Sequence, residues 1–330
     1  MKSTTSWTAT GAIVETCAKA LFDGIIDYAG LFPPARLPMD EAFGRYLEHR
    51  SGSYGWILGR FVCPASRFSE LEPLLTGIDP IHLPIKLAVL GRGGATVEEF
   101  LDAVAQDAAA IRSLSSRHDQ RVVADVFEVR LPASGGVAVA VESAWRLLND
   151  NASSSITPYF EASLLGDWRP RLPASVAAVR DTDRIAGEKH RVGLKIRCGG
   201  LEAAEIPEPA AVAAAIATCR ATGVPLKATQ GLHHPVRHHD PVFDTMVHGF
   251  LNLFAASSLA LVHDLPVTRL TEIVAEVDPA AFAIELDRLS WREFEASAEQ
   301  IAVSRKDLLT TFGSCSFQEP RDDLRDIDLI

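Results

Sequence analysis

The chain has 330 residues, of which 47% are hydrophobic and 23% are charged, a composition typical of a folded globular protein. It has 32 Lys and Arg against 43 Asp and Glu, a net charge of −11 with neutral histidines. An acidic chain without a Lys- and Arg-rich tract repels a phosphate backbone, so we expect no nucleic-acid partner.

The N-terminal segment MKSTTSWTATGAIVETCAKA lacks the unbroken apolar core of a signal peptide. No later stretch reaches about 18 consecutive apolar residues. The five cysteines are scattered without CxxC spacing, which predicts neither a disulfide framework nor a structural zinc site. We therefore expect a cytoplasmic protein with reduced thiols and no membrane partner.

Short apolar runs alternate with longer helical stretches along the chain. In the stretch 96–114, the apolar residues Phe100, Val104, Ala108 and Ile111 recur at helical spacing, which predicts a helix with one apolar face. A later helix is expected to end at Gly223 in the left-handed conformation. Eight runs are predicted to be strands: 24–32, 55–64, 84–91, 121–132, 156–166, 192–200, 224–235 and 281–291.

Alternating strands and helices imply a parallel sheet with right-handed crossovers. Eight such units favour an α/β fold of the (β/α)₈ TIM-barrel type. The sequence contains no GxGxxG or GxxxxGK[ST] nucleotide motif, no internal repeat and no low-complexity linker. We predict a single domain over residues 1–330, in which residues 292–330 form a C-terminal extension that packs across the barrel.

The sixth predicted strand, VGLKIRCGG, carries charges at alternate positions. Leu194, Ile196 and Cys198 suit the helix-facing side of a barrel strand, so Lys195 and Arg197 are expected to face the lumen. The same alternation in four other strands directs further charged side chains inward: Arg60, Glu128, Glu161 and Lys227. The sequence therefore predicts a lumen that contains ions of both signs.

Two interpretations of this charged lumen are open. Ionisable groups are almost never buried unless they are paired, so the charges can form a purely structural salt-bridge layer. They also lie late in their strands, and the carboxyl end of a TIM barrel is where active sites are found. The second interpretation is an active site, and we favour it because buried ions with perturbed pKa values cluster at such sites.

The segment from LKIRCGG to PLKATQG, about residues 192–231, resembles class I aldolases of the deoxyribose-phosphate aldolase type. In that family a Schiff-base lysine on the sixth strand is followed by a second lysine on the seventh. Lys195 matches the first position and Lys227 the second. The family's Gly-Gly after the second lysine is replaced by residues 230–234 here, so a phosphate site is not implied. Outside this segment the chain resembles a bacterial protein family for which the resemblance implies no activity.

Schiff-base chemistry requires a lysine that loses its proton, and burial with nearby cations lowers a lysine pKa. We expect Lys227 and Arg197 to have this effect on Lys195. Glu128 and Glu161 are the expected proton relays. Arg60 and Arg197 are the expected anion site, because guanidinium groups bind carboxylates bidentately. Together these roles predict aldolase-type lyase chemistry on a small, anionic carbonyl compound.

The stretch GLHHPVRHHDPVFDTMVHG holds half of the ten histidines. Its spacing fits no standard metal motif, yet imidazole is the commonest metal ligand and the usual base near neutral pH. We expect His233 to take part in catalysis and His234 in substrate binding. His238 and His239 are expected in a loop or cap before a helix at 243–262. A divalent metal on His233 and His234 defines an alternative function, that of a metal-assisted lyase or hydrolase.

Two further residues complete the candidates. Asp27, at the end of the first predicted strand, is expected to bind substrate. Cys315, in GSCSF, would be a candidate reactive thiol if the C-terminal segment lay over the barrel mouth. We expect it instead to be a small packing residue, as most single cysteines are. No cofactor is required by the preferred reaction. A homo-oligomer is compatible with the sequence, and a barrel that only binds a ligand remains a third, non-catalytic alternative.

Overall fold

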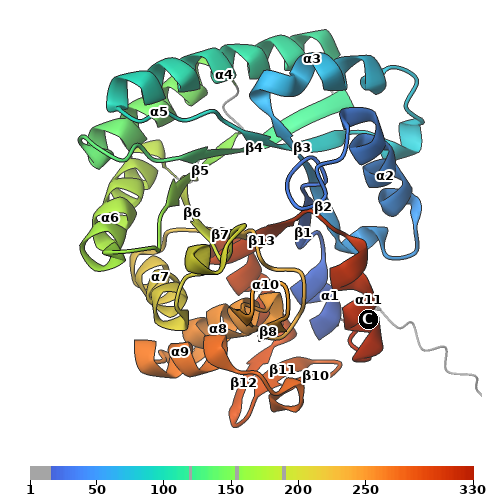
Figure 1. The fold of residues 1–330 in the computed structure, drawn as a ribbon, viewed down its shortest axis with the longest axis vertical. Coiled ribbons are helices and arrows are strands. Elements are labelled where there is room, and N and C mark those ends of the chain that lie inside the picture. The colour runs from blue at the N-terminus through green and yellow to red at the C-terminus, as the bar shows by residue number, and fades with distance from the viewer. Residues whose placement is uncertain (1–15, 119–120, 153–155, 188–190) are drawn as a thin grey trace, which may run out of the picture.

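Eight parallel strands close into a barrel surrounded by helices (Figure 1), as the sequence predicts for a (β/α)₈ fold. The computed structural model describes residues 16–118, 121–152, 156–187 and 191–330. The first fifteen residues, for which no signal peptide is predicted, lie outside the described part. Around the barrel the strands follow the order β1 (Ile26–Tyr28), β13 (Leu309–Ser314), β7 (Leu226–Thr229), β6 (Gly193–Arg197), β5 (Thr157–Ala162), β4 (Val122–Arg130), β3 (Ile85–Leu90) and β2 (Leu58–Pro64).

The helices cover the outside of this barrel and bury one face against it. In α4 the residues at helical spacing, Phe100, Val104, Ala108 and Ile111, are buried as predicted. Helix α7 ends at Gly223 with φ 72°, the left-handed conformation expected there. The helices are α1 (Cys17–Phe22), α2 (Met39–Ser51), α3 (Phe68–Leu71), α4 (Val97–His118), α5 (Val137–Asn151), α6 (Trp168–Ala186), α7 (Pro209–Thr222), α8 (Phe250–His263), α9 (Val267–Ala275), α10 (Ala298–Asp307) and α11 (Gln318–Asp326).

The predicted eighth strand at 281–291 is wrong. These residues form β10 (Phe282–Ile284) and β11 (Arg288–Trp291), which join β12 (Phe294–Ser297) in a three-stranded antiparallel sheet outside the barrel. The same apolar run is compatible with a strand of an external hairpin and with a strand of the barrel. Periodicity does not show which other strand it pairs with.

The strand that closes the barrel is β13. It lies between β1 and β7, with Phe312 opposite Ile26 on one side and Ala228 on the other. The C-terminal segment 292–330 is therefore not an extension laid across a finished barrel, because it supplies the eighth strand. Helix α11 then follows β13 directly.

The histidine-rich stretch also differs from expectation. His238 and His239 lie in β8 (His238–Asp240), which pairs with β9 (Thr245–Val247) in a two-stranded hairpin. Helix α8 begins at Phe250, whereas the predicted helix began at residue 243. Asp240, Val242 and Phe243 of this hairpin line the same cavity as Lys195.

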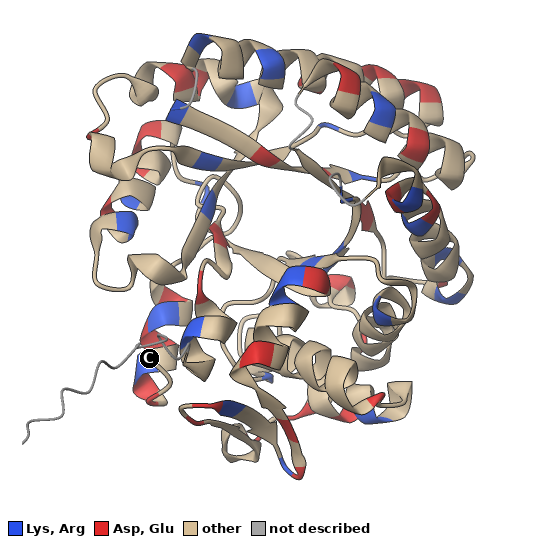
Figure 2. Ribbon diagram, turned by 180° about the vertical axis from the view of Figure 1, so that it is seen from behind, with Lys and Arg blue, Asp and Glu red and all other residues tan. Residues whose placement is uncertain are grey.

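Side chains in β6 alternate as predicted. Leu194 and Ile196 are fully buried in the core between the barrel and the helices, while Lys195 faces the lumen among other charged groups. Figure 2 shows acidic and basic residues on the strands around the lumen as well as on the outer helices. None of the helices in the described ranges is both long enough and apolar enough to cross a membrane.

Candidate active site

The lumen holds a row of ion pairs centred on Glu128 of β4. Lys195 Nζ lies 2.7 Å from Glu128 Oε2, and Lys227 Nζ lies 2.8 Å from Glu128 Oε1. The two lysines come from neighbouring strands, where they are directly opposite each other in the register of β6 and β7. All three side chains are buried. One carboxylate therefore serves two lysines.

The row continues on both sides of this centre. Beyond Lys227, the fully buried Asp27 pairs with the lysine and accepts hydrogen bonds from the Arg60 N–H at 2.7 Å and the Thr311 hydroxyl at 2.9 Å. Beyond Lys195, Glu161 contributes Oε2 at 3.1 Å. Its other oxygen accepts a hydrogen bond from Arg197 Nε at 2.9 Å.

Arg60 lies near the start of β2 and is held by a carboxylate that the sequence analysis did not single out. Its Nε and Nη2 donate to Asp125 Oδ1 and Oδ2 at 2.6 and 2.9 Å, and its Nη1 lies 3.7 Å from Asp27. With Asp125 and Arg60 included, the row contains four carboxylates and four cations. Such pairing offsets the several kcal/mol that burial of each ion costs.

The pKa values follow from this pairing. Burial would raise the pKa of Glu128, but the charges of Lys195 and Lys227 outweigh it and lower that pKa to about 2. Burial would lower the pKa of Lys227, but Asp27 and Glu128 outweigh it and raise that pKa. Lys227 therefore stays protonated at neutral pH. The effect expected of Lys227 and Arg197 on Lys195 stays a prediction.

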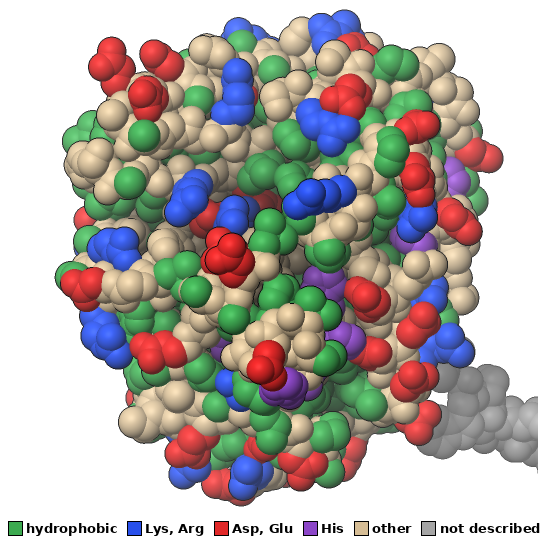
Figure 3. Space-filling model, viewed as in Figure 1, with side chains coloured by type: hydrophobic (Ala, Val, Ile, Leu, Met, Phe, Trp, Pro, Cys, Tyr) green, Lys and Arg blue, Asp and Glu red, His purple; other side chains and the backbone are tan. Residues whose placement is uncertain are grey.

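A cavity of about 560 Å³ opens above this row. Its wall includes the ends of several strands and the loops that follow them, so it lies at the carboxyl end of the barrel, where the fold keeps its active sites. The space-filling view in Figure 3 shows a hollow on this face with histidine side chains beside it. Apolar side chains from two loops, Phe32, Val242 and Phe243, also line the cavity.

The predicted site residues divide into two groups. Glu128, Lys195, Arg197, His233 and His234 line the cavity. The remaining four are not part of its wall and connect to it through the ion pairs: Asp27, Arg60, Glu161 and Lys227. Residues of the first group can therefore contact a ligand in this cavity directly.

His233 and His234 are each held by a different carboxylate of α11. His233 Nδ1 lies 2.8 Å from Glu319 Oε2, and His234 Nδ1 lies 2.5 Å from Asp323 Oδ2. Across the described ranges, no group of three or more His, Cys, Asp or Glu has the arrangement of a metal site. The two imidazoles fasten the loop after β7 to the C-terminal helix.

The cavity wall includes two residues that the sequence analysis did not assign to the site. Gln230 follows β7 with φ 61°, and its side-chain oxygen accepts a hydrogen bond from Arg197 Nη1 at 3.1 Å. Cys315, expected to be a packing residue, lies directly after β13 and lines the cavity. The signal that would have placed Cys315 here is its position one residue beyond the eighth strand, which the incorrect strand assignment concealed.

Comparison with known proteins identifies no family for this chain. No protein-family model and no curated protein matches the sequence. Among solved structures, deoxyribose phosphate aldolase from Aeropyrum pernix, described as having a unique tetrameric structure, is similar with a TM-score of 0.43. The match has 16% sequence identity and covers 68% of this chain and 88% of that chain. The strand order and the lumen define this chain as a TIM-barrel protein with a charged cavity at the carboxyl end.

Proposed function

We propose that this protein is a carbon–carbon lyase of the aldolase type, in which Lys195 forms a Schiff base with a small, anionic carbonyl compound. One observation carries the proposal: Lys195 is buried between two carboxylates and still lines the cavity. Lys227 is the weaker candidate, because it does not line the cavity and its pKa is raised. The resemblance of residues 192–231 to class I aldolases implies the same choice.

The carboxylates supply the proton transfers that this reaction needs. Lys195 must first lose a proton, and a carboxylate with a pKa near 2 is a weak acceptor, so we assign that role to Glu161 rather than Glu128. Nζ then attacks the carbonyl carbon, a C–N bond forms, and the carbonyl oxygen leaves as water after protonation. The resulting cationic imine, whose charge Glu128 stabilises, takes up the electron pair of the bond between the α and β carbons and becomes an enamine. As this bond breaks, the β-hydroxyl gives its proton to Glu161 and becomes the carbonyl group of the released fragment.

Arg197 is the group we assign to the substrate's anionic end. Its side chain is about half exposed (49%) at the cavity, in contrast to the buried lysines. Nε is used by Glu161 and Nη1 by Gln230, while Nη2 takes part in neither contact. A guanidinium held in this way is preorganised to bind a carboxylate close to Lys195.

The test is borohydride reduction with a panel of small aldehydes and keto acids, followed by intact-mass and peptide mass spectrometry. The expected result is an adduct on Lys195 that is lost in Lys195→Met. Lys86→Met is the matched control and keeps the adduct, because Lys86 is an exposed lysine on β3. An adduct on Lys227 would assign the nucleophile to the other lysine. Ligand-induced thermal stabilisation without any adduct would instead support the non-catalytic binding barrel.

A further inference from the structure

A second group of reactive side chains lies at the cavity, outside the row of ion pairs. Cys315 Sγ is 3.7 Å from His233 Nε2, and His233 Nδ1 is 2.8 Å from Glu319 Oε2. The three residues come from the segment after β13, the loop after β7 and the first turn of α11. A thiol, an imidazole and a carboxylate in this order form the arrangement in which a base activates a nucleophile and is itself oriented by a third group.

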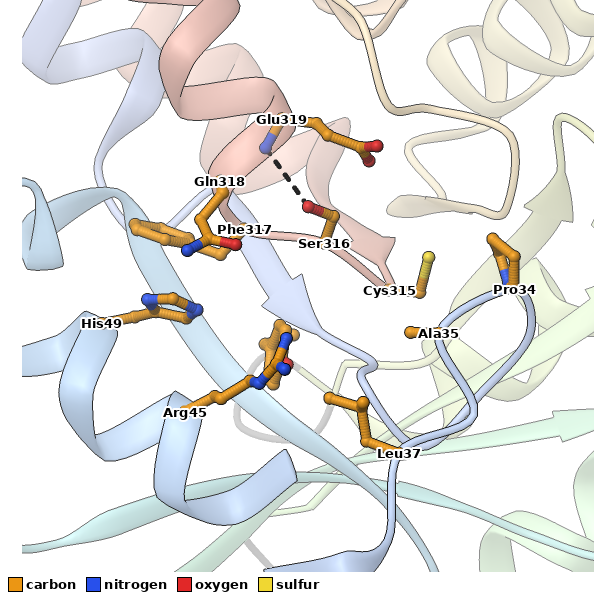
Figure 4. A pocket seen from close by; sticks show the side chains of 11 residues that line it. Pro34, Ala35, Leu37, Arg45, His49, Cys315, Ser316, Phe317, Gln318 and Glu319 are labelled. Atoms are coloured by element: carbon orange, nitrogen blue, oxygen red, sulfur yellow. Dashed lines mark hydrogen bonds between the residues drawn. The ribbon is translucent and has the colours of Figure 1, made fainter. Parts of the chain in front are cut away.

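Cys315 borders a cavity on each of two sides. Cys315 and Glu319 line the 560 Å³ cavity and also a neighbouring cavity of about 290 Å³, which lies between the loop after β1, α2 and the start of α11. Figure 4 shows the smaller cavity, with the Cys315 sulfur and the Glu319 carboxylate turned away from Arg45 and His49 on α2. Cys315 is thus part of the wall between two open spaces.

The contacts of His233 favour its protonated form. Burial would lower the pKa of His233, but its hydrogen bonds with Cys315 and Glu319 outweigh burial and raise that pKa to about 10. The hydrogen bond from His233 lowers the pKa of Glu319. Several other titratable groups line the same two cavities: Tyr28 of β1, Arg45 and His49 of α2, His234 beside His233, and Glu128, Lys195, Arg197, Glu205 and Asp240.

The other four cysteines have a different environment. All are completely buried, and burial raises their thiol pKa values, to about 12 at Cys17, Cys63 and Cys198. The pKa of Cys219 is raised for the same reason. A buried apolar site suppresses thiolate formation, whereas an adjacent imidazolium promotes it. Cys315 differs from these four because it lines two cavities and contacts His233.

We propose that Cys315, His233 and Glu319 form a second reactive centre, in which the Cys315 thiolate adds reversibly to small aldehydes bound in the cavity. The C–S bond forms as the carbonyl π bond breaks, and that electron pair moves to the oxygen. The His233 Nε2 proton is transferred to this oxygen, leaving a neutral thiohemiacetal and a neutral imidazole held by Glu319. The addition is neither an oxidation nor a reduction, needs no leaving group and does not depend on Lys195.

The first test measures the thiolate without requiring reagent access. Thiolate absorbance near 240 nm is followed against pH in the full chain, and the difference between wild type and Cys315→Ser isolates the Cys315 signal. The expected result is a midpoint that depends on the contact with His233. His233→Asn moves it upward, while His239→Asn, an exposed histidine on β8, leaves it unchanged. A midpoint at or above the ordinary thiol value of about 8.5, or no response to His233→Asn, would overturn the proposal.

The second test concerns the ligand class. Iodoacetamide alkylation of Cys315 at pH 6 is expected to be about tenfold faster in the folded chain than in the urea-unfolded chain, where the same thiol is mostly protonated. Propionaldehyde should protect Cys315 saturably, and equally in wild type and Lys195→Met. A low thiolate midpoint without protection would refute aldehyde addition. Equal protection in the two proteins would separate the two proposed centres. Protection that disappears in Lys195→Met would show that the aldehyde is held by the lysine and would refute addition at Cys315.

Discussion

Removal of the Lys227 ammonium group is expected to destabilise the barrel strongly. Lys227 is 1% exposed and pairs with both Asp27 and Glu128, which are themselves buried. In Lys227→Met the side chain is of similar size, but two carboxylates remain in the lumen without their shared cation. Breaking a buried ion pair by removing one partner costs about 3–5 kcal/mol.

Thermal unfolding is the assay for this prediction. At about 2 °C per kcal/mol for a chain of this size, the melting temperature of Lys227→Met should fall by roughly 6–10 °C. Lys86→Met, which removes an exposed lysine from β3, should change it by about 1 °C or less. The double variant Asp27→Asn, Lys227→Met removes one charge of each sign, so it should be more stable than Lys227→Met alone.

Two results would contradict this account of Lys227. If Lys227→Met melts at or above the wild-type temperature, the free-energy cost of burying the ammonium group exceeds the stabilisation from its two ion pairs. The row would then be retained at a net cost in stability. If the double variant is no more stable than the single one, the loss comes from packing around the lysine stem and not from unpaired carboxylates.

Two further predictions concern Gly59 and His248. A Cβ at Gly59 would lie 2.5 Å from Asp27 Oδ1, so Gly59→Ala should cost about 1–3 kcal/mol in a thermal-unfolding assay. Gly44→Ala, in open space on α2, should be neutral or stabilising, and equal effects of the two would contradict the proposed clash. His248 is 1% exposed with its Nε2 2.7 Å from Pro207 O, and burial lowers its pKa from 6.5 to about 4. The unfolded chain therefore binds a proton at His248 more readily than the folded chain does. The free energy of unfolding is at its full value above pH 6.5 and decreases as the pH falls from 6.5 towards 4. His248→Gln should remove about 2–3 kcal/mol of the stability loss between pH 7 and 4.5, and an unchanged acid dependence would disprove this assignment.

The predicted strands show how much of the fold follows from local sequence patterns. Seven of the eight predicted strands are barrel strands, because runs such as 84–91 and 121–132 combine an apolar face with flanking helices. The eighth was misplaced because residues 281–291 and β13 both have the composition of a strand. Which of them pairs with β1 and β7 depends on closing the barrel, a condition that involves residues nearly 300 positions apart.

The charged lumen was predictable because a period of two has a direct physical meaning in a strand. Once Leu194 and Ile196 are assigned to the helix side, Lys195 must face inward. The partners of Lys195 were not predictable in the same way. Its ion pairs with Glu128 and Glu161 depend on distances across the barrel, and these exist only after the strands are in register.

The sequence by itself determined that the chain forms a barrel and that its lumen contains ions of both signs, because alternation and helical periodicity are local properties. The tertiary structure decided which ions meet, that Lys227 is protonated, and that Cys315 lies beside His233. These are properties of distance and desolvation between distant segments. A carboxylate beside a lysine and a thiol beside an imidazole change each other's pKa only when folding brings them within a few ångströms of each other.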